Sequence, residues 1–361
     1  MRKALQLWLV LGVLNPGILT AQEANSGLDL RETLSGQFAA SNVFTEAPRS
    51  GAPADVGFRS VTYPTWKINS NWTATGVWQF TTRPYFYEDF STAGYGANGN
   101  LLQASLNYSR VSDKGSILIR AGQLQTVCGS FPLFYDDMEN ALVDVPIEYG
   151  YYGAPVSLYG IDGAQMDGTR GKWDGRAQFA NSSPANPRSL FARDQYGNWA
   201  GGGGYTIRQG LRVGVSAYRG PYLNRQSWYF PWGEESPSKL PAHALGLDAR
   251  WVYGHWTVQG EAQGFVMPYT VIPTYREKAG YGELKKALSP RWYVAARDGY
   301  SASKAAGNVE CIEGAAGFRP GRLELIKISY EHEHYSTGSA RNENTLAIQF
   351  VTSFHIAKAW H

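Results

Sequence analysis

Acidic side chains are concentrated in residues 126–155, the longest stretch of the chain that keeps no regular alternation of apolar and polar residues. Charged groups around a narrow aqueous gap attract or repel ions according to their sign. Acids that face arginines across such a gap would therefore create a transverse electric field. The candidate acids are Asp136, Asp137, Glu139, Asp144 and Glu148, and the candidate bases are Arg83, Arg120, Arg176 and Arg212.

A second group of candidates is the sequence EHEHY, in which Glu331, His332, Glu333 and His334 are all able to bind a metal ion. Neighbouring residues of a strand point to opposite faces, so only the two glutamates or the two histidines can share a side. We therefore expect an interfacial or loop role for this sequence. The chain has no GxSxG motif, and the glycines of residues 200–210 lack the lysine of a phosphate-binding loop. No catalytic residue, metal or cofactor is expected.

The elements that must position these side chains are short strands. In residues 102–111 the apolar Leu102, Ala104 and Leu106 alternate with polar residues, which is typical of a strand with one apolar face. A tight turn at residues 112–115 follows, and then a new alternating segment begins. The same unit recurs and predicts about 16 strands, at 34–41, 65–70, 72–84, 102–111, 116–125, 156–168, 171–181, 201–208, 211–219, 244–253, 256–266, 277–287, 291–298, 308–319, 322–333 and 344–356. Pro64 is expected to shorten the second of them, because proline cannot donate to the ladder.

The connections between these segments alternate between short turns and long loops. This alternation fits an antiparallel meander whose two ends both lie on the side of the short turns. Residues 126–155 are the third long connection. The predicted long connections lie near 42–64, 85–101, 126–155, 182–200, 220–243, 267–276, 299–307 and 334–343.

Two all-β classes are compatible with many short strands. A soluble propeller should show an internal repeat of about 40–50 residues, and no such repeat is found. A transmembrane β-barrel explains the apolar outer face, the polar inner face and the unequal connections together. We therefore predict an all-β fold, a transmembrane antiparallel β-barrel of about 16 strands with short periplasmic turns and long extracellular loops.

The N-terminus resembles a secretory signal peptide, with Arg2 and Lys3 before an apolar run and Ala21 at the expected cleavage site. This divides the chain into a signal peptide, residues 1–21, and a barrel, residues 22–361. Without residues 1–21 the chain has 31 basic and 30 acidic residues, a balance that argues against a nucleic-acid partner. Cys128 and Cys311 could form one disulfide or remain unpaired.

Aromatic residues are expected at the two membrane interfaces, where indole and phenol rings are favoured. The last strand has an apolar face and ends in an aromatic residue, Trp360, followed by His361, which resembles the C-terminal strand of Gram-negative outer-membrane proteins. The aromatics expected beside the short turns are Trp72, Trp173, Trp251, Tyr253, Trp256 and Trp292, and those expected at the opposite strand ends are Tyr85, Phe86, Tyr87 and Tyr218.

In length, strand number and loop alternation the chain resembles the Gram-negative outer-membrane porins of the 16-strand type. The segment IRAGQLQTVCGSFPLFYD is also similar to a region of the phosphate- and anion-selective porins. We do not extend the phosphate selectivity of that group to this chain, because its basic and acidic residues are nearly equal in number. The resemblance implies that the third loop, residues 126–155, folds into the lumen and narrows the pore; an extracellular loop with solvated acids is the alternative.

The function that follows is passive diffusion of small hydrophilic solutes or ions through a water-filled barrel in the bacterial outer membrane. The expected partners are outer-membrane lipid, lipopolysaccharide and the permeating solutes, and the resemblance also implies a homotrimer. Two alternatives stay open. One is a substrate-specific outer-membrane channel, and the other is a plugged barrel that acts as an adhesin or a lipid-modifying enzyme.

Overall fold

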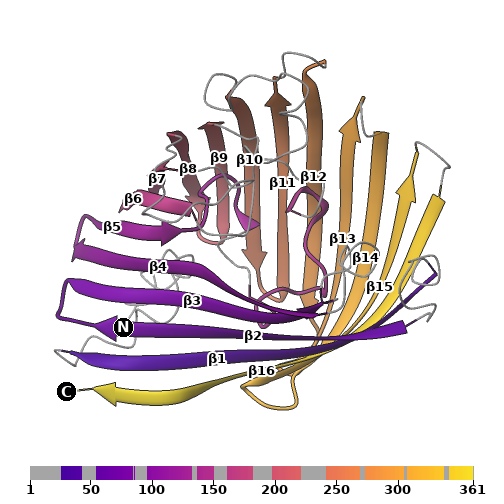
Figure 1. Cartoon of the computed structure of the whole chain (residues 1–361), viewed down its shortest axis with the longest axis horizontal. Helices are drawn as coiled ribbons and strands as arrows, with labels where there is room; N and C mark the ends of the chain where they lie inside the picture. The colour runs from indigo at the N-terminus through magenta and orange to yellow at the C-terminus, as the bar shows by residue number, and fades with distance from the viewer. Residues whose placement is uncertain are drawn as a thin grey trace.

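The chain is a closed barrel of antiparallel strands in the computed structural model (Figure 1). The described residues are 26–42, 54–83, 85, 96–131, 136–149, 161–181, 197–220, 241–268, 273–304, 307–336 and 341–360. They form 16 strands: β1 (Gly27–Ser41), β2 (Ala54–Lys67), β3 (Trp72–Arg83), β4 (Gly96–Ser112), β5 (Gly115–Leu124), β6 (Ile161–Arg170), β7 (Trp173–Ala180), β8 (Asn198–Arg208), β9 (Leu211–Gly220), β10 (Ala242–Tyr253), β11 (Trp256–Met267), β12 (Tyr275–Ala287), β13 (Trp292–Ser303), β14 (Gly307–Phe318), β15 (Glu324–Tyr335) and β16 (Arg341–Trp360).

Each strand pairs with its neighbours in sequence, and β16 pairs with β1 to close the barrel. The closing pair is antiparallel and runs from Gly27 opposite Trp360 to Ser41 opposite Thr345. Gly27 also lies opposite Lys67, at the end of β2 that leads into a short turn, so both ends of the barrel lie on the turn side. The predicted fold class, strand number and position of the ends are confirmed.

The two faces of the wall differ in polarity, as the alternation predicts. In β10 the outward side chains of Leu245 and Leu247 are 66% and 60% exposed, whereas the inward Asp248 is 8% exposed. The same division holds in β15, where Ile328 points outward and the neighbouring Lys327 is fully buried inside. The outer face is thus an apolar band suited to lipid, and ionised groups are directed inward.

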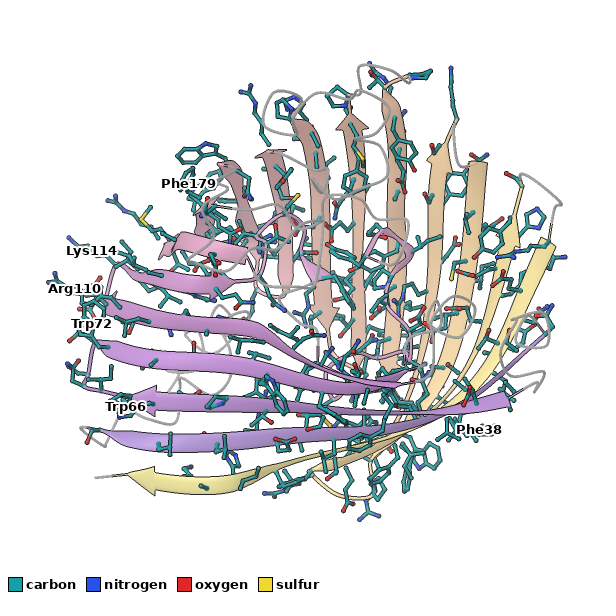
Figure 2. The ribbon with its side chains drawn as sticks, in the orientation of Figure 1. Phe38, Trp66, Trp72, Arg110, Lys114 and Phe179 are labelled. Atoms are coloured by element: carbon teal, nitrogen blue, oxygen red, sulfur yellow. The ribbon has the colours of Figure 1, made fainter. Side chains whose placement is uncertain are left out.

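Aromatic side chains lie at the turn end of the wall. Figure 2 shows Trp66 and Trp72 at this end, beside the basic residues Arg110 and Lys114. Both tryptophans are exposed, and the same is true of Trp173, Tyr253, Trp256 and Trp292. This arrangement suits the boundary between hydrocarbon and water.

The prediction for Tyr85 and Tyr218 is wrong. Both side chains are buried, with 1% and 3% exposed, and both point into the barrel. The Tyr85 hydroxyl donates a hydrogen bond to Asp137, so its polar end has a partner inside. Tyr218 has the same parity in β9 as the buried Ser216, so the alternation itself places its ring on the inner face. Phe86 and Tyr87 lie outside the described residues.

Several strand boundaries also differ from the prediction; β1 begins at Gly27 rather than at 34, and β2 begins at Ala54 rather than at 65. β2 continues through Pro64, which lies opposite Leu30 of β1, while the ladder to β3 passes from Thr62–Trp78 to Thr65–Thr75. The missing proline donor therefore interrupts one ladder locally without ending the strand. β13 extends to Ser303 and β14 begins at Gly307, so the seventh of the predicted long connections is residues 304–306 rather than 299–307.

Helical structure is limited to one short 3-10 turn, η3 (Ile147–Tyr149), among the elements of the described residues. No helix in the described part of the chain is long and apolar enough to cross a membrane.

The apolar outer face predicts a position-dependent cost for a charged substitution. Leu247→Arg, near the middle of β10, should destabilise the folded barrel in phospholipid vesicles by about 2–4 kcal/mol. Leu288→Arg, in a turn, is the matched control and should cost about 0–1 kcal/mol. The measurement is urea unfolding followed by tryptophan fluorescence. Equal costs at the two positions would contradict an outer face immersed in lipid.

Candidate functional site

The described residues of the third loop, 126–131 and 136–149, contact inward side chains of many strands. Ser130 and Tyr149 of the loop meet at Glu261 of β11. Its Oε2 accepts hydrogen bonds from Ser130 N and Oγ, at 3.0 and 2.9 Å, and from the Tyr149 hydroxyl at 2.6 Å. Gln263 Nε2 donates to Oε1 at 2.5 Å. One carboxylate thus joins two loop residues that are 19 positions apart, Ser130 and Tyr149, to the wall.

Gly129 allows this close approach. Its φ of +86° is a conformation that favours glycine, and a Cβ there would lie 2.1 Å from the Tyr149 hydroxyl. The Gly129 carbonyl accepts from Arg176 Nη2, and its N–H donates to Ser216 Oγ at 3.0 Å. Arg176, a candidate base, therefore binds the loop backbone. Close to the start of the loop, the backbone conformation and the close contacts of Gly129 leave no room for a larger residue.

Cys128 is a packing residue beside this junction. Its thiol is fully buried in an apolar cluster that includes Phe131 and Tyr149. Burial and the charge of Glu261 raise the pKa of Cys128 to about 12, so the thiol stays protonated at neutral pH. Cys128 and Cys311 are both free, which excludes the disulfide left open by the sequence.

The middle of the loop is held by Asp137, one of the candidate acids. Its Oδ2 accepts from Arg59 Nη1 at 3.0 Å, Ser35 Oγ at 2.8 Å and the Tyr85 hydroxyl at 3.0 Å. Burial alone would raise the pKa of the Asp137 carboxyl, but the charges of Arg59 and Lys327 and the hydrogen bonds hold it below its usual range. Asp137 and Arg59 are buried together, with side chains 4% and 1% exposed.

Lys327 of β15 binds the loop backbone on the same side. Its ammonium donates to three carbonyls, Asp137 at 3.0 Å, Asn140 at 3.3 Å and Leu142 at 2.8 Å. These oxygens satisfy the three donors of a lysine side chain that is fully buried. Leu142 packs beside it in an apolar cluster that includes Ala315, so polar and apolar contacts act together.

Asp136 and Asp144 are also bound to the wall. Asp136 Oδ2 accepts from the Tyr63 hydroxyl at 2.5 Å and lies 3.4 Å from Arg31 Nη2. The Asp144 carbonyl accepts from Arg297 Nη2 at 2.9 Å, and its N–H donates to Glu313 at 3.3 Å. Both side chains are buried. Their contacts hold the loop against β1, β2, β13 and β14.

Glu139 differs from the other candidate acids because it is exposed. Arg250 of β10 and Lys285 of β12 both lie within electrostatic reach of its carboxylate. Arg319 is adjacent in space, because its Nη2 donates to the carbonyl of Met138 at 3.3 Å. Glu139 is therefore an exposed acid in a basic part of the inner face.

The remaining candidate bases pair with acids of the wall. Arg120 Nε lies 3.5 Å from Asp167, and Arg212 lies 2.7 Å from Asp174 and 2.5 Å from Asp248. Arg83 belongs to β3, and its side chain lies outside the described part of the structure. Sequence reasoning did not single out Arg31 and Arg59, because the predicted strands began at 34 and 65. Extending the alternation through Pro64 would have placed Arg59 inside.

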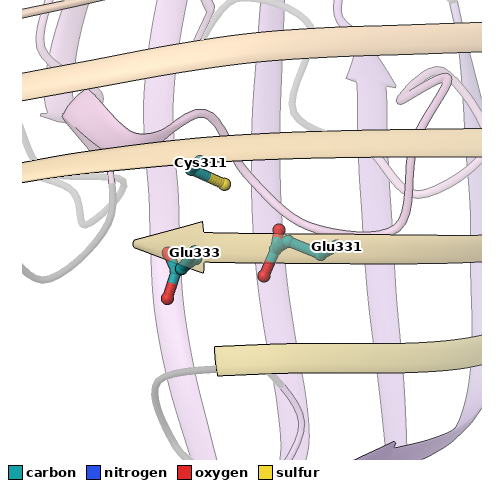
Figure 3. Close-up of side chains that lie close together, drawn as sticks. All are labelled: Cys311, Glu331 and Glu333. Carbon is teal, nitrogen blue, oxygen red and sulfur yellow. The ribbon is translucent and has the colours of Figure 1, made fainter. Parts of the chain in front are cut away.

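A group of possible metal ligands lies elsewhere on the inner face (Figure 3). Cys311 of β14 is opposite Glu333 of β15, and the ligand atoms of Cys311, Glu331 and Glu333 lie within 4.8 Å of one another. As predicted, the two glutamates share a face, while His332 and His334 contact Asn344 and Asn342. Glu333 also accepts from the Tyr335 hydroxyl. A thiolate with two carboxylates is a ligand set that zinc accepts.

Solved structures share this architecture. An anion-selective porin from Comamonas acidovorans has a TM-score of 0.64 at 10% identity, covering 91% of this chain and 100% of that chain. OmpF of Salmonella typhi, in complex with daunomycin, has a TM-score of 0.63 at 11% identity, covering 91% and 97%. The trimer form of OmpT from Vibrio cholerae has a TM-score of 0.56 at 10% identity, covering 91% and 100%.

No protein-family model and no curated protein sequence matches the chain. At identities this low, the likeness to solved structures establishes the fold. The chain has the 16-strand barrel fold of Gram-negative outer-membrane porins, as its sequence predicts.

The Asp137–Arg59 contact predicts a large effect of one neutral substitution. Asp137→Asn removes the negative charge from a buried ion pair with Arg59 and should destabilise the protein by about 3–5 kcal/mol. Glu139→Gln is the matched control two residues away. Because Glu139 is exposed, its substitution should change stability by less than about 0.5 kcal/mol. Urea unfolding in vesicles measures both, and a stable Asp137→Asn variant would contradict the buried ion pair.

Proposed function

We propose that the chain is a porin of the bacterial outer membrane, through which small hydrophilic solutes or ions diffuse passively. The third loop, residues 126–155, would narrow its water-filled lumen. One observation carries this proposal. The described loop residues bind Ser35 and Arg59 on β1 and β2, and also Ser216 and Glu261 on β9 and β11. In barrel order β1 and β9 are half a circuit apart, and contacts with both support a loop that lies inside the barrel.

The contacts suggest different roles for the candidate acids. Asp136, Asp137 and Asp144 are buried and bound to the wall, which suits them to hold the loop. Glu139 is exposed and lies within electrostatic reach of Arg250 and Lys285, which suits it to act on passing ions. Opposed charges across an aqueous gap produce a transverse field. We therefore assign selectivity chiefly to Glu139 and the bases around it.

Export and assembly complete the proposal. Residues 1–21 would direct the chain out of the cytoplasm and be removed, and the outer apolar band would lie in outer-membrane lipid beside lipopolysaccharide. The trimer form of OmpT supports a homotrimer. Arg120, Arg176 and Arg212 would form part of the pore wall, together with Arg83.

Conduction is the direct test of the function. Purified protein inserted into planar bilayers should give stepwise increases in current, because each barrel adds one aqueous path. Insertion confirmed by immunoblot without any current would contradict a pore and would favour a plugged barrel. Saturable block of the current by one solute would identify a substrate-specific channel instead of a general one.

The assignment of Glu139 predicts a change in ion selectivity without a change in fold. Glu139→Gln should lower the cation-to-anion permeability ratio by about twofold to fivefold, the scale of one screened charge in water. The measurement is the reversal potential in a salt gradient. Glu310→Gln removes an exposed carboxylate from β14 and should leave the reversal potential unchanged. An equal shift in both variants would contradict the assignment.

A further inference from the structure

Glu148 is a buried acid that the docking contacts of the loop do not use. It lies in η3, and its side chain is fully buried. Neither carboxyl oxygen has a hydrogen-bond partner among the described residues. The adjacent Tyr149 differs, because its hydroxyl binds Glu261. Burying an ionised carboxylate without donors is strongly unfavourable, so the surroundings of Glu148 suit its neutral form.

Charged and titratable groups face Glu148 from three strands. Glu261 on β11 is negative and already accepts several hydrogen bonds, and Tyr281 on β12 adds a weakly acidic hydroxyl. Arg297 on β13 is the positive group. Its guanidinium lies 3.2 Å from Glu313 and 3.6 Å from Glu283, so its charge is largely engaged. The local field therefore opposes a second negative charge in η3.

The direction of the titration follows from these contacts. Burial and the charge of Glu261 raise the pKa of Glu148 well above the ordinary value of 4.5, and the backbone N–H of Glu148 and the charge of Arg297 only partly offset them. In a loop released into water, the same carboxyl would return towards its ordinary pKa. A pKa that is higher in the docked state means that docking is most stable at acidic pH. The stability falls as the pH rises above 4.5 towards the raised pKa.

We propose that Glu148 is a pH-sensitive latch: its neutral carboxyl lets η3 dock on the wall, and its ionisation at higher pH releases η3 from the wall. This inference rests on the proposed porin function. Release is local, because the Asp137 contacts with Arg59 and Ser35 hold the middle of the loop independently. The pore would then fluctuate towards wider states as the pH increases.

Single-channel recordings from about pH 5 to about pH 8 test the latch. The wild-type protein should show one steady conductance near the acidic limit of this range. States of higher conductance should become more frequent as the pH rises. The undocking equilibrium constant should rise up to tenfold per pH unit. Glu148→Gln and Glu148→Met cannot ionise, so both should stay steady throughout. Glu310→Gln should behave like the wild type.

Hydrogen exchange of the loop amides gives a readout that does not require conduction. Exchange at residues 147–149 in wild type and Glu148→Gln is compared at the same pH, which cancels the intrinsic effect of pH. The amides of residues 147–149 should exchange faster in the wild-type protein than in Glu148→Gln, and this difference should grow as the pH rises. An identical pH response in wild type and Glu148→Gln, by current or by exchange, would overturn the latch. A silent barrel with normal exchange differences would overturn the porin function and retain the latch.

Discussion

The pairing of β1 with β16 is the constraint on which the rest of the structure depends. A sheet that crosses lipid has no water to satisfy the backbone groups of an open edge, so it must close on itself. The ladder from Gly27–Trp360 to Ser41–Thr345 supplies those partners. Once the sheet is closed, every strand has one face towards lipid and one towards the lumen. Alternation in sequence then becomes a separation of apolar from ionised groups.

Closure creates a second requirement inside the barrel. Ionised residues that cannot face lipid accumulate on the inner wall, where some of them are buried and need partners. The third loop supplies many of these. Asp137 neutralises Arg59, loop carbonyls bind Lys327, and loop N–H groups bind Glu313. The loop and the wall therefore stabilise each other, and the same contacts suit the loop to shape the lumen.

Most of the fold follows from alternation and from turn chemistry, because these are local properties of the chain. The strand number, the inward position of Asp248 and the outward position of Leu247 all result from a period of two residues. The errors concern places where local rules compete with tertiary contacts. β2 continues through Pro64 because its other neighbour, β1, still pairs there. Tyr85 points inward because its hydroxyl donates a hydrogen bond to Asp137, which is distant in sequence.

The sequence by itself determined that the chain is a 16-strand barrel with polar side chains inside. It also determined that the third of the long connections is acidic. Only the tertiary structure decided which of the acids bind the wall and which face water. Asp137 and Glu139 are two residues apart in an acidic segment, and nothing local distinguishes them. Asp137 meets Arg59, which lies 78 positions away along the chain, whereas Glu139 remains exposed. Charge partners of this kind are set by the curvature of the closed sheet, which brings distant strands around one loop.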